Sequence, residues 1–501
     1  MSGIMLNIDN SGFLFRGPEE RMTKEGVDER LEVYSGTHVT DLAFCVAGRG
    51  RTRVDLGVAG WEPIWTNLDE WEAHGRAESV RNSLLLHERG IDPFARWLAR
   101  TSDLDMKGWL SIRANDVHHT PVFDNPLHPQ YWKDHPELWR RPYRLERDVD
   151  RGFDFGRQKI RDRLVRLVEA LTNRYDMDGL EIDWLRKPYV FAPGHEQLGS
   201  DLVTGMMERI RRILDKAGTD IELAVRVPQT PRASRGFGLD AVRWAREGIV
   251  DRIAPCPDMH VNNDIPVDLW KDAVHGTDTM ICPGLNILIK SYPERPRCKE
   301  GSPMNVSPAV VRGLAASFLH RGGDSLNFFN LYSPQVWNPE IYRNVLLEAG
   351  RLDSLIGKPR RHMLTYNDTP APGDGHRATL PISCGPIGAL DHRASARTDT
   401  ANLRIYTGPA PADHERVNVR LAFPGATRRF GHRLGIPREA EVRVNGKTCT
   451  FQGPSESEEP TPREDLWAYS VPLDAMQEGY NMIETLTTRA TTIEWAEIAF
   501  C

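Results

Sequence analysis

Short apolar runs alternate with segments of helical periodicity over the first 350 residues of the chain. Apolar side chains recur every three or four residues over 160–171 and 202–214, which predicts amphipathic helices, and Gly218 stands where the second helix is expected to end. Strands that alternate with helices form a parallel sheet covered by those helices, so the pattern predicts a (β/α)8 TIM barrel over residues 1–350. The eight runs expected to be strands span residues 4–8, 41–46, 109–114, 179–184, 221–227, 252–255, 280–285 and 325–330.

The pattern changes after residue 350. Residues 351–375 are rich in Gly and Pro, which predicts a linker or a first irregular strand. Short alternating runs then follow, separated by turn signals such as Asn445 followed by Gly446, so residues 376–501 are expected to form a smaller antiparallel β-sandwich. The expected sandwich strands span residues 403–406, 417–423, 441–444, 467–471, 482–485 and 493–500.

Polar residues interrupt the barrel strands on one face. Side chains of a barrel strand alternate between the interior and the helix layer. Leu110 and Ile112 suit the helix layer, so the residues between and after them point inward. The same alternation applied to all the strands turns inward Ser111, Arg113, Asn115, Glu181, Asp183, Arg226, Met5, Asn7 and Asp9, with Asn286 and Asn330 closing the last two strands. The polar members gather at the carboxyl ends of the strands, where such barrels hold their active sites.

The segment 178–184 lies at the centre of this group. Glu181 and Asp183 are two residues apart on one strand face, so their Cα atoms are expected about 6–7 Å apart, with Asp183 at the rim within reach of a substrate. Arg113 and Arg226 on the flanking strands would keep at least one carboxylate ionised, as a nucleophile or an oxocarbenium stabiliser requires. The alternative is an ion network of Arg113, Glu181 and Arg226 that only organises the barrel.

Cleavage of a glycosidic bond also needs a proton donor, which is usually a second carboxyl group. The candidates at the same end of the barrel are Asp9, Asp116, Asp258 and Asp264. A donor two strands away from Asp183 would face it across a cleft, which favours Asp258. Each candidate can instead be a loop cap or a turn residue, since Asp is common in loops.

Three histidines near these carboxylates, His118, His119 and His260, suggest a divalent metal as an alternative. The chain has no HxH or HExxH spacing, so neither a metal nor another cofactor is expected. A GxSxG nucleophile elbow and a phosphate-binding loop are also missing from the sequence.

Composition excludes several classes of protein. The chain of 501 residues is 40% hydrophobic and 27% charged, which is typical of a soluble globular protein. Its net charge is −6 and it has no dense basic tract and no apolar run of the length of a membrane span, so neither nucleic acid nor a membrane is an expected partner. The seven cysteines are scattered and the start lacks a secretory signal pattern, which favours a cytoplasmic location. A homo-oligomeric state stays open.

Aromatic residues concentrate in two long loops, 47–80 and 115–145. Their tryptophans, Trp61, Trp65, Trp71, Trp132 and Trp139, could stack on the apolar faces of sugar rings and build subsites. The alternative is that each tryptophan serves as the core of its own loop.

Three motifs stand at the end of the third predicted strand and in the fourth and fifth: Arg-Ala-Asn-Asp at 113–116, Asp-Gly-Leu-Glu-Ile-Asp at 178–183 and Ala-Val-Arg-Val-Pro at 224–228. Through these motifs, residues 1–350 resemble the bacterial barrel proteins grouped as family-ten-like glycosyl hydrolases. The resemblance implies Asp183 as the principal catalytic carboxylate and leaves the acid unassigned, since the fifth strand offers Arg226. The seventh strand has no Glu, so the pattern with a nucleophile on that strand is not met. The tail is similar to the β-sandwich accessory domains of glycoside hydrolases.

The sequence therefore favours a glycoside hydrolase with a carbohydrate substrate. Arg49, Arg113, Arg186 and Arg226 near the rim point to an anionic sugar, such as a uronic acid or a sulfated residue, because a guanidinium group binds such groups in two places at once. The alternatives are a metal-dependent sugar isomerase or lyase and a non-catalytic carbohydrate-binding barrel. The expected catalytic residues are Asp183, Glu181, Asp258 and Asp116, and the expected substrate-binding residues are Asp9, Asn115, Arg113, His118, His119, Arg186, Arg226, His260, Asn286 and Asn330.

Overall fold

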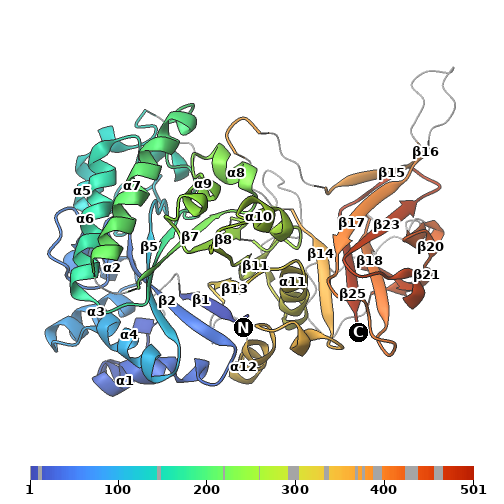
Figure 1. Ribbon diagram of the computed structural model, residues 1–501, viewed down its shortest axis with the longest axis horizontal. Coiled ribbons are helices and arrows are strands. Elements are labelled where there is room, and N and C mark those ends of the chain that lie inside the picture. Colours follow the sequence, from blue (N-terminus) through green and yellow to red (C-terminus); the bar gives the residue numbers. More distant parts are fainter. Residues whose placement is uncertain are drawn as a thin grey trace.

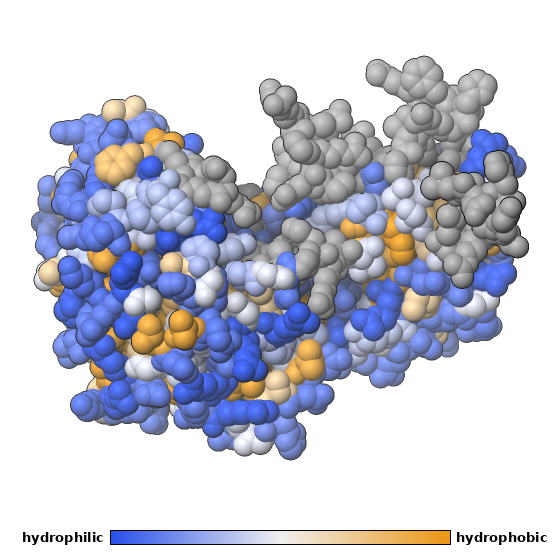
Figure 2. All heavy atoms as spheres, turned by 90° about the horizontal axis from the view of Figure 1, so that it is seen from above, coloured by the Kyte–Doolittle hydropathy of each residue, from blue (hydrophilic) through white to orange (hydrophobic). Residues whose placement is uncertain are grey.

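A computed structural model shows a barrel and a smaller β-sandwich side by side (Figure 1), and the face of the molecule seen in Figure 2 is mainly hydrophilic. It describes residues 2–8, 14–143, 148–217, 220–258, 260–290, 304–331, 338–366, 371–374, 379–386, 398–423, 438–455 and 466–501. Asp9 and Gly218, two residues singled out from the sequence, lie outside these ranges. No helix in the described ranges has both the length and the apolar character of a membrane-crossing segment.

The barrel is a closed parallel sheet. The seventh predicted strand, 280–285, is split at Pro283 into two short strands. The first pairs with the sixth strand, Arg252–Cys256, and the second with the eighth strand, Leu326–Phe329. Both halves belong to one stretch of chain, so the sheet closes on itself and the eight predicted strands are confirmed. The strands in spatial order are β1 (Ile4–Ile8), β2 (Val39–Gly48), β5 (Lys107–Arg113), β6 (Gly179–Asp183), β7 (Glu222–Pro228), β8 (Arg252–Cys256), β9 (Met280–Ile281) with β10 (Gly284–Leu285), and β13 (Leu326–Phe329).

Helices cover the outside of this sheet. The two helices predicted from periodicity are present as Gln158–Arg174 and Glu196–Lys216. The first buries the apolar stripe that predicted it, and the second buries most of its stripe but leaves Leu202 exposed. The helix that begins at Pro93 has Asp92 as its N-cap, whose side chain accepts hydrogen bonds from the backbone of Phe94 and Ala95. The helices are α1 (Lys24–Asp28), α2 (Leu68–Ala73), α3 (Glu78–Glu88), α4 (Pro93–Asp103), α5 (Gln130–Asp134), α6 (Gln158–Arg174), α7 (Glu196–Lys216), α8 (Pro231–Gly236), α9 (Ala241–Arg246), α10 (Val267–Ala273), α11 (Pro308–His320) and α12 (Pro339–Glu348).

The barrel interior is layered as the alternation predicts. Leu110 and Leu180 belong to the large core between the sheet and the helices. A separate small cluster at the amino end of the barrel consists of Met5, Ala43, Trp109 and Ala224. Above it the interior turns polar, with four buried side chains in mutual contact: Asn7, Ser111, Glu181 and Asn327.

The C-terminal region consists of antiparallel sheets, in agreement with the predicted sandwich. β14 (Arg360–Leu364) lies inside the range 351–375 and pairs with β25 (Trp495–Phe500). The sandwich therefore begins within the stretch that the sequence assigned to a linker or an irregular strand. The first sheet has the order β14 (Arg360–Leu364), β25 (Trp495–Phe500), β18 (Val417–Ala422), β22 (Leu466–Val471) and β21 (Thr450–Pro454). A second sheet has the order β17 (Ala401–Tyr406), β23 (Tyr480–Leu486), β19 (Glu441–Val444) and β20 (Lys447–Thr448). A third has the order β16 (Thr398–Asp399), β15 (Ile382–Pro386) and β24 (Thr491–Ile493).

The sandwich packs against the barrel through α11 and β14, which lie next to each other in Figure 1. The Ser317 hydroxyl on α11 lies 3.1 Å from Nδ1 of His362 and donates to the backbone oxygen of Tyr406 at 2.9 Å. Burial holds the pKa of His362 well below its usual range, so this imidazole is neutral. The interface is therefore a packed, hydrogen-bonded contact.

Candidate active site

The Glu181 carboxyl group lies in the middle of the barrel and is fully buried. Ser111 donates to its Oε1 atom at 2.8 Å, Asn327 donates to its Oε2 atom at 3.4 Å, and the Asn7 amide also contacts Oε1. Burial, with a further contribution from the negative charge of Asp183, raises the pKa of Glu181 to about 7. Glu181 therefore lies in the polar layer beneath the mouth of the barrel, away from solvent.

Asp183 lies one step closer to the mouth and is also 0% exposed. Its Oδ1 atom accepts a hydrogen bond from the backbone of Leu185 at 2.8 Å and lies 3.4 Å from Nε of Arg226. The inward direction predicted for Asp183 is confirmed, but the prediction that it stands exposed at the rim is wrong. Alternation along a strand decides which way a side chain points, whereas its exposure depends on what the loops place above it.

Arg226 is enclosed in the same way. Its guanidinium group is 0% exposed and lies 3.5 Å from the centre of the Phe329 ring, on β13. Arg186, in the loop after β6, lies over the same ring at 5.6 Å. The Phe329 ring thus contacts both Arg226, which is paired with Asp183, and the more outlying Arg186.

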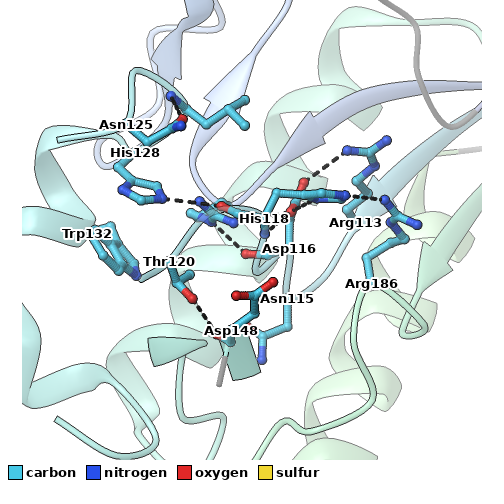
Figure 3. Close-up of polar contacts among 12 residues, drawn as sticks. Arg113, Asn115, Asp116, His118, Thr120, Asn125, His128, Trp132, Asp148 and Arg186 are labelled. Carbon is cyan, nitrogen blue, oxygen red and sulfur yellow. Dashed lines mark hydrogen bonds and ion pairs between the residues drawn. The ribbon is translucent and has the colours of Figure 1, made fainter. Parts of the chain in front are cut away.

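Asp116, in the loop after β5, is the centre of a second group of charges (Figure 3). Arg113 donates to its Oδ2 atom at 3.0 Å, and Arg49 lies 3.3 Å from its Oδ1 atom. Burial acts to raise the pKa of Asp116, but His118 and the two arginines outweigh it and hold that pKa well below its usual range. Asp116 is therefore ionised at neutral pH.

His118 connects this group to the loop after β6 (Figure 3). Its Nδ1 atom lies 2.5 Å from Oδ1 of Asp116, and its Nε2 atom lies 2.7 Å from Nη2 of Arg186. The His118 side chain is 41% exposed, compared with 9% for Asp116. His118 is thus the solvent-accessible member of a chain that runs from Arg113 through Asp116 to Arg186.

A pocket of about 720 Å³ opens beside this chain; we call it the basic pocket. Its wall carries two carboxyl groups, Glu78 and Asp116, and one imidazole, His118. The remaining lining residues, five of them arginines, are Arg16, Arg53, Ile64, Trp71, Gly75, Arg76, Ser79, Val80, Arg113, Leu127, Arg186 and Asn330. Four residues predicted to bind substrate therefore meet here, together with the predicted catalytic Asp116: Arg113, His118, Arg186 and Asn330.

Asp258 and His260 lie in a different group, after β8. Asp258 forms an ion pair with Lys187 at 2.6 Å, and the amide of Asn286 donates to the backbone oxygens of Pro257 and His260. Burial lowers the pKa of His260. Asn286 therefore holds a loop in place, and none of these residues is in the lining of the basic pocket.

Asn115 and His119 also have positions that the sequence did not indicate. The buried Asn115 amide donates to the backbone oxygens of Phe153 and Tyr189, so it ties three loops together instead of facing the pocket. His119 is exposed with a positive φ of 58° and is not in the pocket lining. Its pKa is lowered, first by partial burial and then by the charge of its neighbours, including His118.

The loop tryptophans are mostly core residues of their loops. Trp61, Trp132 and Trp139 are buried, and the rings of the last two stack 4.4 Å apart. Trp71 lines the basic pocket although it is only 8% exposed, and Trp65 is half-buried and stacks on His87. Among these tryptophans, the structure thus places only Trp71 in the wall of the basic pocket.

Sequence reasoning missed three charged residues of the pocket, Arg16, Arg76 and Glu78. Arg16 comes from the loop after β1, Arg76 from the segment just before α3 and Glu78 from the first residue of α3, and no strand alternation points to them. The closely spaced charges Arg76 and Glu78 just before an amphipathic segment were the available signal. Within the described ranges, no three His, Cys, Asp or Glu side chains converge in a way that could hold a metal ion.

No protein-family model matches this chain, and no curated protein matches it. Solved structures that it resembles include an α-L-fucosidase from Paenibacillus thiaminolyticus (13% identity, 70% of this chain and 49% of that chain, TM-score 0.42). A GH27 β-L-arabinopyranosidase from Geobacillus stearothermophilus (11%, 97% and 96%, 0.38) and an α-amylase from Anoxybacillus (10%, 97% and 98%, 0.36) are also similar. The chain spans about half the length of the fucosidase. None of these similarities identifies the family-ten-like group.

Proposed function

We propose that this protein is a glycoside hydrolase that acts on anionic sugars in the basic pocket. The observation that supports the proposal is the composition of the pocket wall, where five arginines surround the carboxyl groups of Asp116 and Glu78 beside the mouth of the barrel. Arginine binds carboxylate and sulfate groups through paired hydrogen bonds, and hydrolysis of a glycosidic bond uses two carboxyl groups in different protonation states.

In this proposal Asp116 supplies the ionised carboxylate, since its charge is stabilised by His118, Arg113 and Arg49. Glu78 is the other carboxyl group of the described lining and is the candidate proton donor. Asp183 is a positioning residue. It holds the backbone of Leu185 and thereby the turn that carries Arg186 into the pocket wall.

Turnover of matched oligosaccharides tests the proposal. Uronic acid or sulfated substrates are expected to be cleaved at least roughly tenfold faster, in kcat/KM, than the same chains with neutral sugars. Asp116→Asn is expected to lower kcat roughly 10³-fold. The matched control is Asp258→Asn, whose carboxylate is paired with Lys187 outside the pocket lining and whose loss should change kcat little.

The dependence of the cleavage rate on the leaving group tests the role of Glu78 as proton donor. Glu78→Gln is expected to slow cleavage of sugars with poor leaving groups roughly 10²-fold, and to leave aryl glycosides with good leaving groups nearly unaffected, because these need no proton. Equal loss on both substrates would contradict the assignment. If Asp183→Asn abolishes turnover with unchanged substrate affinity while Asp116→Asn does not, Asp183 is the reacting carboxylate.

A second candidate is a carbohydrate-binding barrel without catalysis. It is favoured by the burial of Asp183 and by the low exposure of the Asp116 side chain, 9%. Saturable binding of an anionic oligosaccharide, with no cleavage of any member of the substrate panel, would support this candidate and contradict the hydrolase.

A further inference from the structure

The imidazole of His118 is held between an acceptor and a donor. Asp116 is ionised and can only accept, so the Nδ1 atom of His118 carries the hydrogen of their 2.5 Å contact. A second hydrogen bond, from the backbone N–H of His118 to the same carboxylate oxygen at 3.0 Å, fixes the ring relative to Asp116. The tautomer with hydrogen on Nδ1 leaves the lone pair on Nε2.

The lone pair on Nε2 of His118 accepts a hydrogen bond from Arg186. A guanidinium group has only donors, so the 2.7 Å contact between Nη2 of Arg186 and Nε2 of His118 requires Nε2 to accept. Only a neutral imidazole can do so. The exposed side of this contact belongs to the basic pocket, since both residues are in its lining. Nε2 thus takes the place that an anionic oxygen of a ligand would take on Arg186.

We propose that Arg186 and His118 form an anion subsite that binds a carboxylate or sulfate group of the sugar and takes up a proton as it does so. The inference rests on the proposed function, because it names the group by which the basic pocket recognises its substrate. An anionic oxygen replaces Nε2 of His118 as the acceptor for Arg186. The lone pair of Nε2 then takes a proton from solvent.

The charges on both sides of the ring favour this proton in the bound state. The imidazolium would lie between Asp116 at Nδ1 and the ligand anion at Nε2, whereas in the empty pocket Nε2 faces the positive charge of Arg186. The bound state therefore binds the proton more tightly than the free state, and linkage makes anion affinity rise as pH falls. The charged and titratable groups around His118 come from several elements. Asp116 and His119 lie on its own loop, Arg113 at the end of β5, Arg49 after β2 and Arg186 after β6. Further groups are His128, Asp148, whose charge acts on His119, and the residues Arg16, Arg53, Arg76 and Glu78, which line the same pocket.

Isothermal titration calorimetry of the full chain tests the subsite. Glucuronate and glucose 6-sulfate are the probes, neutral glucose is the blank, and each titration is done in buffers with different heats of ionisation. We expect uptake of more than zero and at most one proton per anion, and roughly fivefold weaker binding at about pH 8 than at about pH 6. The anion that binds more tightly identifies the group as carboxylate or sulfate, and either result supports the proposal.

Two variants distinguish the role of His118 in proton uptake from the role of Arg186 in anion binding. His118→Gln keeps an acceptor for Arg186 but cannot titrate, so the anion should bind without proton uptake. Arg186→Gln should weaken binding at least roughly tenfold. His87→Gln, an exposed histidine on α3 outside the pocket lining, is the matched control and should retain the wild-type proton uptake. Proton uptake that persists in His118→Gln, or anion binding with no proton exchange in the wild type, would overturn the proposal.

The two proposals can fail separately. Proton-linked anion binding in a protein that cleaves no sugar would contradict the hydrolase and support the subsite. Cleavage of sugars by a protein that binds neither glucuronate nor glucose 6-sulfate would overturn the subsite and leave a glycoside hydrolase.

Discussion

At the scale of single residues, Glu181 is an acidic group in the polar layer of the barrel. Its carboxyl group is fully buried, and burial together with Asp183 raises its pKa to about 7. The Oδ1 atoms of Asn7 and Asn327, two neighbours that donate to Glu181 through their amides, have no hydrogen-bond partner within the described ranges. These acceptors suit a protonated carboxyl group, which has a hydrogen to donate.

Glu181→Gln tests this interpretation at the residue scale. A raised pKa means that the folded state holds the proton more tightly than the unfolded state, so stability present below about pH 4.5 is lost as pH rises to about 7. The loss corresponds to about 3 kcal/mol. In Glu181→Gln, the free energy of unfolding from urea titrations should lack this decline, because an amide does not titrate.

The exposed Glu169→Gln on α6 is the control and should keep the wild-type decline. An unchanged pH dependence in Glu181→Gln would show that Glu181 titrates alike in the folded and unfolded protein.

At the scale of elements, the first residue of β6, Gly179, lies where a side chain would not fit. A Cβ atom on Gly179 would lie 2.2 Å from Cε3 of Trp109 on β5, which fills the amino end of the barrel. The indole ring is rigid and fully buried, so it cannot give way. The spacing between β5 and β6 therefore depends on this glycine.

Gly179→Ala is expected to lower the free energy of unfolding by about 3 kcal/mol, because the added methyl group overfills the interior. The matched control is Gly205→Ala in the middle of α7, where a Cβ atom would meet nothing within 4 Å. That variant should gain roughly 0.8 kcal/mol from helix propensity. Denaturant titrations measure both changes, and equal effects of the two variants would refute the packing argument.

For the whole molecule, the contact between α11 and β14 joins the barrel to the sandwich. A Cβ atom on Gly313 would lie 2.0 Å from the backbone oxygen of Arg361, so helix and strand approach each other across this glycine. Backbone atoms of a paired strand cannot move aside singly. Any residue larger than glycine at position 313 must separate the two parts of the molecule.

Gly313→Ala should therefore lower the free energy of unfolding by about 3 kcal/mol, although the same change in an unobstructed helix would be stabilising. Calorimetry should show a lower melting temperature, and a second transition if barrel and sandwich unfold separately. A melting temperature at or above that of the wild type would mean that the contact contributes nothing to stability.

Much of the fold was predictable because its signals are local. Alternation along 179–184 correctly turned Glu181 inward, and helical periodicity located α6 and α7. The position of β14 was left open, since a strand flanked by Pro and Gly has no alternation long enough to separate it from a linker. Its pairing with β25 joins residues that are more than a hundred positions apart.

The candidate site was less predictable, for a related reason. Asp116, His118 and Arg186 were singled out from loops after neighbouring strands, and the structure brings them together. Asn115 and Asn286 were expected to bind substrate but hold backbone oxygens, because a polar residue at a strand end can serve a loop as well as a ligand. The catalytic roles themselves remain predictions.

The sequence by itself determined the closed barrel, the sandwich and the inward direction of the central carboxylates, since these follow from periodicities of two and 3.6 residues. Only the tertiary structure decided that Asp183 is covered while the basic pocket opens beside Asp116 and His118. Exposure depends on how loops distant in sequence pack over a strand end. The loop after β1 and the start of α3, which supply Arg16 and Glu78, are placed in the pocket wall by packing, and no strand alternation predicts that position.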